Sequence, residues 1–295
     1  MTANLPASIH ARLLNHAKTM GEDFNQVLAR YATERFLYRL STLPAREQFW
    51  LKGAKLFDLW FNVPHRPTRD ADFLGFGHVD AEVLRTTMTA ICTVQADDGM
   101  IFDSDSIAIE DIREDARYGG LRVRLVGRLG NARSTIQLDV GYGDAVTPGP
   151  QEATYPTLLE GFPAPRLRVY PRETVVAEKL EAIVSLGMAN TRLKDFYDLR
   201  ALALEGRCDP QLLAEAISAT FKRRGTPIPD ELPMGLSTTF AEDSAKRTQW
   251  NAFLRKNKLG DVDFGSVIVE VRAFLEGPLA TARSNVSSRR EQDLR

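Results

Sequence analysis

The sequence predicts a mixed α/β fold of the α+β class, with a mixed β-sheet in its core and a helical domain at its C-terminal end. Residues 121–128 and 133–144 alternate apolar and polar side chains, as expected for a hairpin that turns at Gly130. From Tyr170 onward, apolar residues recur at helical spacing instead. The Pro- and Gly-rich residues 145–167 lie between the two patterns and are typical of a connection.

The composition is that of a globular protein. At 295 residues the chain has the length of two domains of about 100–200 residues each. Its 43% hydrophobic and 26% charged residues exclude a disordered or fibrous protein. A net charge of -1 excludes a globally basic nucleic-acid-binding protein, although it allows a local basic patch. Because no long apolar run and no secretory signal is visible, we expect a cytoplasmic protein.

The elements of the first half follow from caps, breakers and alternation. Asp80 is a good N-cap for a helix over 80–94. Asp70 and Asp72 alternate with apolar neighbours, which indicates a strand over 69–76. The other elements expected in this half are helices at 6–40 and 55–62 and strands at 48–51 and 107–113.

The second half is expected to be helical. Pro171 suits the start of a helix over 172–188, and Asp209 with Pro210 suits the start of one over 209–224. Further helices are expected at 192–204, 241–256 and 264–275. The predicted division is a helical segment at 1–45, the core at 46–165, a helical domain at 166–283 and a flexible tail at 284–295.

Two carboxylates on the 69–76 strand form the first candidate site. On a strand, Asp70 and Asp72 point to one face about 6–7 Å apart. Such a pair suits Mg²⁺, and two metal ions can stabilise both the attacking and the leaving oxygen of a nucleotidyl transfer. Gly53 and Ala54 precede a helix start, where backbone amides can approach a phosphate. Each feature alone also fits a solvated strand or an ordinary turn, whereas their order along the chain is more specific.

Further charged residues have two interpretations each. Asp139 is either a third carboxylate of the site or a hairpin residue that faces water. Lys179 lies on the apolar stripe of its helix, where it either binds an anion or lays its stem along apolar surface. Asp195 and Asp198 share one flank of their helix, and the ordinary interpretation of Asp198 is a surface i,i+4 residue paired with a neighbour such as Lys194.

Arginines are plentiful near these elements. They favour a surface for RNA or nucleotide phosphates about as well as a solvated strand face. They are Arg66, Arg69, Arg113, Arg117, Arg122, Arg124, Arg128 and Arg133, with a second cluster at Lys222, Arg223 and Arg224.

Taken together, these motifs resemble a known family over roughly residues 46–255. Gly53-Ala54, Thr68-Arg69-Asp70-Ala71-Asp72 and Asp139 are similar to the core of the DNA polymerase-β-type nucleotidyltransferase superfamily. The segments 170–180 and 192–199 resemble the AbiEii/AbiGii-type nucleotidyltransferase toxins. These are the toxins of type IV toxin–antitoxin pairs and include the MenT-type enzymes.

The resemblance implies roles for the matching residues. Asp70 and Asp72 would hold Mg²⁺ and the incoming triphosphate, and Asp139 would be the base for the attacking hydroxyl. Lys179 would contact nucleotide phosphates, and Asp195 would complete the site from the helical domain. The implied nucleotide-binding residues are Gly53, Ala54, Thr68, Arg69 and Lys179. Thr68 also matches a hydroxyl residue that antitoxins modify in some family pairs, whereas Ala54 departs from the usual Gly or Ser and limits that contact to the backbone.

The implied activity is the transfer of a nucleoside monophosphate from an NTP to the 3′ end of tRNA, which releases pyrophosphate and blocks translation. A cognate antitoxin is the implied protein partner. Two alternatives stay open: the same chemistry on a protein or small-molecule hydroxyl, and a non-catalytic module bound by an antitoxin.

Overall fold

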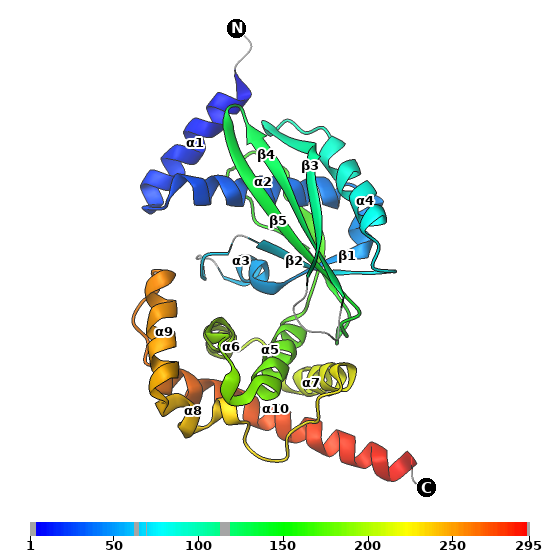
Figure 1. The fold of residues 1–295 in the computed structure, drawn as a ribbon, viewed down its shortest axis with the longest axis vertical. Helices are drawn as coiled ribbons and strands as arrows, with labels where there is room; N and C mark the ends of the chain where they lie inside the picture. The colour runs from blue at the N-terminus through cyan, green and yellow to red at the C-terminus, as the bar shows by residue number, and fades with distance from the viewer. Residues whose placement is uncertain (1–3, 62–64, 69, 113–118, 294–295) are drawn as a thin grey trace. The chain divides into compact units, whose positions relative to one another are not determined.

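The computed structural model describes residues 4–61, 65–68, 70–112 and 119–293, with side chains up to residue 285. The chain forms two compact units, one of residues 1–143 with 151–169 and one of residues 144–150 with 170–295. The first unit contains a seven-stranded sheet with helices, and the second is built from helices (Figure 1). The predicted mixed α/β fold is confirmed. The finer division expected from the sequence, with limits at residues 45, 165 and 283, remains a prediction.

The sheet of the first unit has the strand order β3-β4-β5-β2-β1-β7-β6. Strand β2 is parallel to β5 and β1 to β7, whereas the other neighbours are antiparallel, so the sheet is mixed. The elements of this unit, with η for 3-10 helices, are α1 (Leu5–Met20), α2 (Phe24–Ser41), η1 (Pro44–Gln48), β1 (Phe49–Lys52), η2 (Gly53–Leu56), α3 (Phe57–Trp60), β2 (Asp70–Gly75), α4 (Ala81–Thr93), β3 (Met100–Ile112), β4 (Gly120–Leu129), β5 (Ala132–Tyr142), β6 (Gln151–Thr154) and β7 (Arg166–Val169).

Local sequence signals explain most of these boundaries. The carboxylate of Asp80 accepts hydrogen bonds from the backbone N–H groups of Glu82 and Val83, so it is the expected N-cap of α4. Gly130, at φ +57°, makes the predicted turn between β4 and β5. The helical stretch expected at 6–40 is divided at Gly21, which ends α1 in the left-handed conformation.

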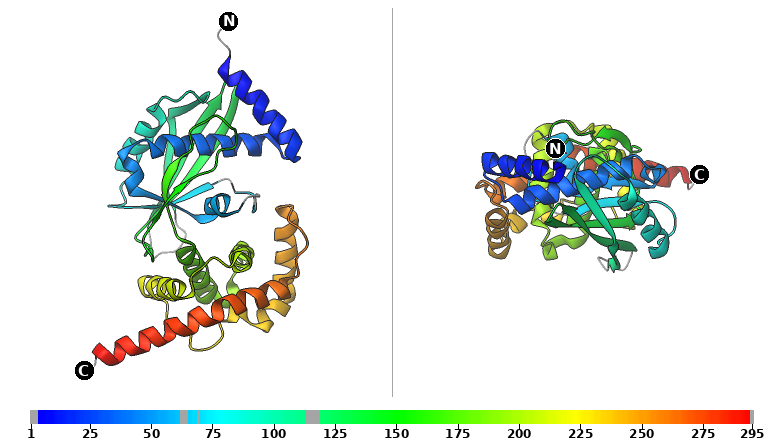
Figure 2. Two further views of the ribbon diagram at one scale, coloured as in Figure 1. Left: turned by 180° about the vertical axis from the view of Figure 1, so that it is seen from behind. Right: turned by 90° about the horizontal axis from the view of Figure 1, so that it is seen from above.

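Helices α2 and α4 pack against one face of the sheet (Figures 1 and 2). On that face, Phe73, Leu138 and Val123 of three adjacent strands are buried. Most of the residues that alternate with them, among them Asp72, Asp139 and Arg122, point to the opposite face and are polar. This division into an apolar and a polar face places the candidate site residues of the first unit together on the polar face.

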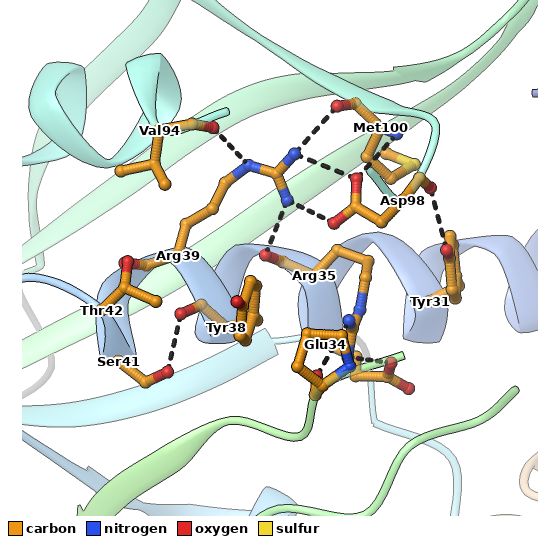
Figure 3. Close-up of polar contacts among 11 residues, drawn as sticks. Tyr31, Glu34, Arg35, Tyr38, Arg39, Ser41, Thr42, Val94, Asp98 and Met100 are labelled. Carbon is orange, nitrogen blue, oxygen red and sulfur yellow. Dashed lines mark hydrogen bonds and ion pairs between the residues drawn. The ribbon is translucent and has the colours of Figure 1, made fainter. Parts of the chain in front are cut away.

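Helix α2 also carries charged residues into the interior of the first unit (Figure 3). The side chain of Arg39 is 2% exposed and forms a bidentate ion pair with Asp98, at 2.6 and 3.0 Å. Its remaining N–H groups donate to the backbone carbonyls of Val94, Arg35 and Met100. All five donors of the guanidinium are therefore used, and α2 is joined to the segments on either side of Asp98.

The Arg39→Met variant should lose about 3–5 kcal/mol of unfolding free energy, because it leaves Asp98 as an uncompensated buried charge. Urea denaturation followed by circular dichroism measures this loss. The matched control is Arg46→Met, which removes an exposed ion pair with Glu47 and should cost about 1 kcal/mol or less. Equal costs for the two variants would show that the Arg39 network does not stabilise the unit.

Two expectations for the first unit are wrong. The 145–167 connection contains β6 and β7, which extend the sheet beyond β1. Strand β6 is polar and largely exposed and shows no period-two pattern, and β7 alternates polar and apolar residues over only four positions, too few for a clear signal. The helix expected at 55–62 is limited to the 3-10 helix η2 and the single turn α3, since a segment this rich in aromatic residues has a weak helix propensity.

The second unit buries an aromatic cluster among its helices. The ring of Trp250 stacks on that of Phe264 at 5.0 Å between centroids, and Phe196 contacts Phe240 and Phe264. Its elements are α5 (Arg172–Leu186), η3 (Gly187–Ala189), α6 (Leu193–Glu205), α7 (Pro210–Arg224), η4 (Met234–Leu236), α8 (Thr238–Glu242), α9 (Ser244–Lys256) and α10 (Phe264–Asp293).

Helix α10 is longer than predicted. It packs against α6, α7 and α8 and runs past residue 275 to Asp293 (Figure 2). The pair Gly277-Pro278 is typical of a helix end, but Leu279 and Ala282 continue the buried stripe and hold the helix in place. Among the described helices, none has the length and apolarity to cross a membrane.

Candidate active site

Strand β2 places Asp70 and Asp72 on the polar face of the sheet, as predicted. In the ladder, Asp72 stands opposite Lys52 of β1 on one side and opposite Asp139 of β5 on the other. Paired residues share a face, and neighbouring strands lie about 4.7–4.9 Å apart. The fold therefore brings the three carboxylates predicted for the site onto one face of two adjacent strands.

Gly53 makes room for the carboxylate of Asp72. Its backbone has φ +71°, and a Cβ at this position would lie 2.0 Å from Oδ2 of Asp72. Two reasons require a glycine here: the left-handed backbone conformation and the close approach of the Asp72 carboxylate both disfavour a side chain. Gly53 and Asp72 are thus one local structure rather than two independent motifs.

The Gly53→Ala variant should lose about 100-fold or more in activity, because the new methyl group displaces the Asp72 side chain. It should also lose about 1–3 kcal/mol of stability from backbone strain. A transfer assay and urea denaturation measure the two effects. Gly260→Ala, at a glycine with open space around it and no positive φ, is the control and should change neither. A fully active Gly53→Ala enzyme would contradict this role for Gly53.

Asp139 forms a bidentate ion pair with Arg122, which stands opposite it on β4. The Nε and Nη2 atoms of Arg122 donate to the two carboxylate oxygens at 2.8 and 2.7 Å. The side chains are 27% and 17% exposed, so the pair is half-buried. Asp139 therefore does not simply face water. Its carboxylate is held by the guanidinium of Arg122 on the neighbouring strand.

The three carboxylates supply the oxygen donors that Mg²⁺ prefers. Within the part of the chain that the structure describes, no three His, Cys, Asp or Glu side chains are arranged to hold a metal ion. Both oxygens of Asp139 accept hydrogen bonds from Arg122. The donor types of these three residues fit a divalent cation.

The other predicted nucleotide-binding residues lie close to these carboxylates in sequence. Thr68 is half-buried, and its hydroxyl donates to the backbone carbonyl of Asp70 at 3.4 Å. Ala54 lies in η2 directly after Gly53. Arg69 lies outside the described residues. Thr68 and Ala54 are thus positioned by the same strand and turn that hold the carboxylates.

Lys55 anchors η2 in the interior, which the sequence does not indicate. Its side chain is 2% exposed, and its ammonium lies 3.8 Å from the carboxylate of Asp58. Burial lowers the pKa of Lys55, and Asp58 opposes this shift. Asp58 also accepts a hydrogen bond from the hydroxyl of Tyr155. These contacts fix the residues that follow the Gly53 turn.

The arginines of β4 are paired with carboxylates rather than forming a bare cationic surface. Besides Arg122 with Asp139, Arg124 pairs with Glu110 at 2.8 Å and Arg128 with Asp103 at 3.2 Å. This arrangement favours the interpretation as a charged strand face. Of the other arginines in this cluster, Arg113 and Arg117 lie outside the described residues.

In the second unit, Lys179 binds two buried carboxylates. Its Nζ donates to Asp195 at 2.6 Å and to Asp198 at 2.8 Å. Both carboxylates are fully buried, whereas the lysine side chain is 13% exposed. The interpretation of Asp198 as a surface partner of Lys194 is wrong. The signal for the correct partner is the three-residue spacing of the two aspartates, which puts both on the flank of α6 that faces α5.

The second oxygen of Asp195 accepts a hydrogen bond from Arg192 at 2.7 Å. Burial alone would raise the pKa of Asp195, but the charges of Lys179 and Arg192 outweigh it and lower the pKa below its usual value. The group is therefore a balanced cluster of two carboxylates and two cations. It presents one partly exposed ammonium, that of Lys179.

The family match agrees with the resemblance seen in the sequence. The family described as "Nucleotidyl transferase AbiEii toxin, Type IV TA system" matches residues 35–276. The crystal structure of JHP933 from Helicobacter pylori is similar at 17% identity and a TM-score of 0.47, over 96% of this chain and 98% of that one. A second H. pylori crystal structure, of a candidate nucleotidyltransferase, is 18% identical with a TM-score of 0.47, over 92% and 97%. The comparison with curated proteins gives no match.

Proposed function

Because the chain belongs to the AbiEii family of nucleotidyltransferase toxins of type IV toxin–antitoxin systems, we propose that it transfers a nucleoside monophosphate from an NTP to the 3′ end of tRNA. Family membership makes it an enzyme of the transferase class with an antitoxin as partner. The tRNA acceptor, the use of Mg²⁺ and the action in the cytoplasm are parts of the proposal. A blocked acceptor end would stop aminoacylation and hence translation.

The observation that best supports the proposal is the pairing register of β2 with β5, together with the space that the Gly53 turn leaves beside Asp72. Asp70 and Asp72 share a face with Asp139, and Gly53 leaves space for the Asp72 carboxylate. We assign Asp70 and Asp72 to Mg²⁺ and Asp139 to the third carboxylate position. When bound, the metal neutralises charge that develops on the transferring phosphoryl group.

The bond changes assign a task to each residue. The 3′-hydroxyl oxygen attacks the α-phosphorus, the bond between the α-phosphorus and the bridging oxygen breaks, and pyrophosphate leaves with the electron pair. Asp139 accepts the proton of the hydroxyl. Gly53 and Ala54 contact phosphate through their backbone N–H groups, and Thr68 and Arg69 belong to the same nucleotide-binding segment.

Lys179 and Asp195 are the contribution that we propose for the second unit. Lys179 holds a partly exposed ammonium on two fully buried carboxylates, an arrangement that fixes its position and suits contact with nucleotide phosphates. Asp195 positions this ammonium. Thr68 is the site that we propose for modification by the antitoxin, because it lies two residues before Asp70 and its hydroxyl reaches the backbone carbonyl of that residue.

A transfer assay tests the proposal. Purified protein is incubated with Mg²⁺, total tRNA and each α-labelled NTP in turn, beside the Lys179→Ala and Lys194→Ala variants. We expect label on tRNA with the wild-type protein and with Lys194→Ala, since Lys194 is exposed on α6. Lys179→Ala should show no transfer.

The other outcomes point to the alternatives. Label on protein or on a small molecule, with tRNA unlabelled, would move the acceptor to another hydroxyl. The absence of label on every acceptor, together with no Mg²⁺-dependent NTP binding by calorimetry, would indicate a non-catalytic module. Full transfer by Lys179→Ala would overturn the role assigned to Lys179.

A further inference from the structure

Asp139 is the residue of β5 that we assign to the candidate metal site, and its carboxylate is held in an ion pair by Arg122. Asp139 uses both carboxylate oxygens to accept hydrogen bonds from one guanidinium, at 2.8 and 2.7 Å. A bidentate, charge-assisted pair of this kind is among the stronger side-chain contacts. Because it is half-buried, water screens it less than a fully exposed pair.

Four charged residues form a row across the polar face of the sheet. Lys52, Asp72, Asp139 and Arg122 occupy paired positions on the consecutive strands β1, β2, β5 and β4. The two acidic residues stand in the middle and a basic residue stands at each end. Without a cation, the charge of the inner pair is compensated by the outer residues, and a divalent cation at the inner pair would compete with them.

We propose that Arg122 is a positioning residue that holds Asp139 away from the metal site, and that the cation completes its site by taking the Asp139 carboxylate from Arg122. This inference rests on the proposed function, because it uses the metal site assigned there. The exchange makes metal binding weaker than the three carboxylates alone would give. It also makes Asp139 available as a base only once the cation is bound.

The neighbouring Arg124 offers a matched control. It lies two residues along β4 on the same face, and its ladder partner on β5 is the neutral Gln137. Its ion pair goes to Glu110, which is 56% exposed. Replacing Arg124 therefore removes the same charge from the same face but frees no carboxylate of the candidate metal site.

The test is a calorimetric titration of nucleotide-free protein with Mn²⁺ alone. Arg122→Gln should bind the cation about five- to tenfold more tightly than the wild type, and Arg124→Gln should change the affinity by less than about twofold. Arg122→Lys keeps the charge but loses the planar fork, and we expect an intermediate gain. Asp139→Asn should bind more weakly than the wild type, and adding Arg122→Gln to it should give no gain.

Three results would overturn the proposal: equal Mn²⁺ affinity of the wild type and Arg122→Gln, equal gains for Arg122→Gln and Arg124→Gln, or an unchanged affinity of Asp139→Asn. A second measurement does not depend on how well the glutamine variant folds. The side-chain Nε–H signal of Arg122 in nitrogen NMR spectra, assigned by its loss in Arg122→Lys, should shift when Mg²⁺ is added to the wild type. A signal that does not move would show that Asp139 stays on Arg122.

The transfer assay and the Mn²⁺ titration test the two proposals separately. If Mn²⁺ affinity rises in Arg122→Gln but no nucleotide is transferred to any acceptor, Arg122 keeps its role and the proposed activity is wrong. If transfer occurs while the two affinities are equal, the activity stands and the role of Arg122 is wrong.

Discussion

The Asp72→Asn variant should transfer nucleotide at least about 1,000-fold more slowly than the wild type, with little change in stability. Asparagine has nearly the shape of aspartate, so it fits the space beside Gly53. It lacks the negative charge with which Asp72, in the proposed site, would hold the cation. The rate of label transfer to tRNA and the urea midpoint measure the two parts of this prediction.

Asp105→Asn is the control for charge. Asp105 is an exposed carboxylate on β3 in the same unit, so its loss changes the net charge equally. It should leave transfer within about twofold of the wild type, because surface charges contribute little at a distance. An Asp72→Asn enzyme as active as Asp105→Asn would show that Asp72 does not hold the cation.

The parts of the fold that could be predicted are those with a local signal. The strand at Asp70 and Asp72 follows from alternation, and α4 follows from its Asp80 cap. Strands β6 and β7 could not be predicted, because four-residue strands at the end of a sheet are stabilised by their neighbours and carry little pattern of their own. The continuation of α10 past Pro278 depends likewise on packing, which overrides the local breaker.

For the candidate site, residue types were easier to predict than partners. The Asp-x-Asp motif and its shared face follow from strand geometry. The register that sets Asp72 beside Asp139 comes from long-range pairing, on which the sequence is silent. The same holds for Arg122 on Asp139. The burial of Asp198 could not be predicted either, because the spacing to Lys194 also fits an exposed pair and burial depends on how the helices pack.

Removing the ammonium of Lys179 should affect both stability and activity. Lys179→Met removes the ammonium that Asp198 binds at 2.8 Å, while Asp195 keeps Arg192. We expect a loss of about 3–5 kcal/mol of unfolding free energy in urea denaturation at neutral pH. Transfer should fall to background, since the proposed phosphate contact is gone.

The pH dependence of this loss has a definite sign. In the wild type the lowered pKa of Asp195 contributes stability that is present above the unfolded pKa of about 4 and is lost as the pH falls. Lys179→Met removes the larger of the two charges that lower the pKa of Asp195, so this contribution is smaller in the variant. The part of the stability deficit that comes from Asp195 should therefore be fully present above about pH 4 and shrink as the pH falls below it, where the wild type loses the contribution as well.

The double variant Lys179→Met/Asp198→Asn separates the structural from the chemical role of Lys179. It removes one cation and one buried carboxylate together, so most of the lost stability should return, because no buried charge is left uncompensated. Asp195 and Arg192 stay paired in it. Asp198→Asn alone keeps Lys179 on Asp195 and should retain transfer. If the double variant recovers stability but not transfer, Lys179 acts on the nucleotide. If transfer returns with stability, the lysine only holds α5 and α6 together, and the phosphate contact belongs to another residue.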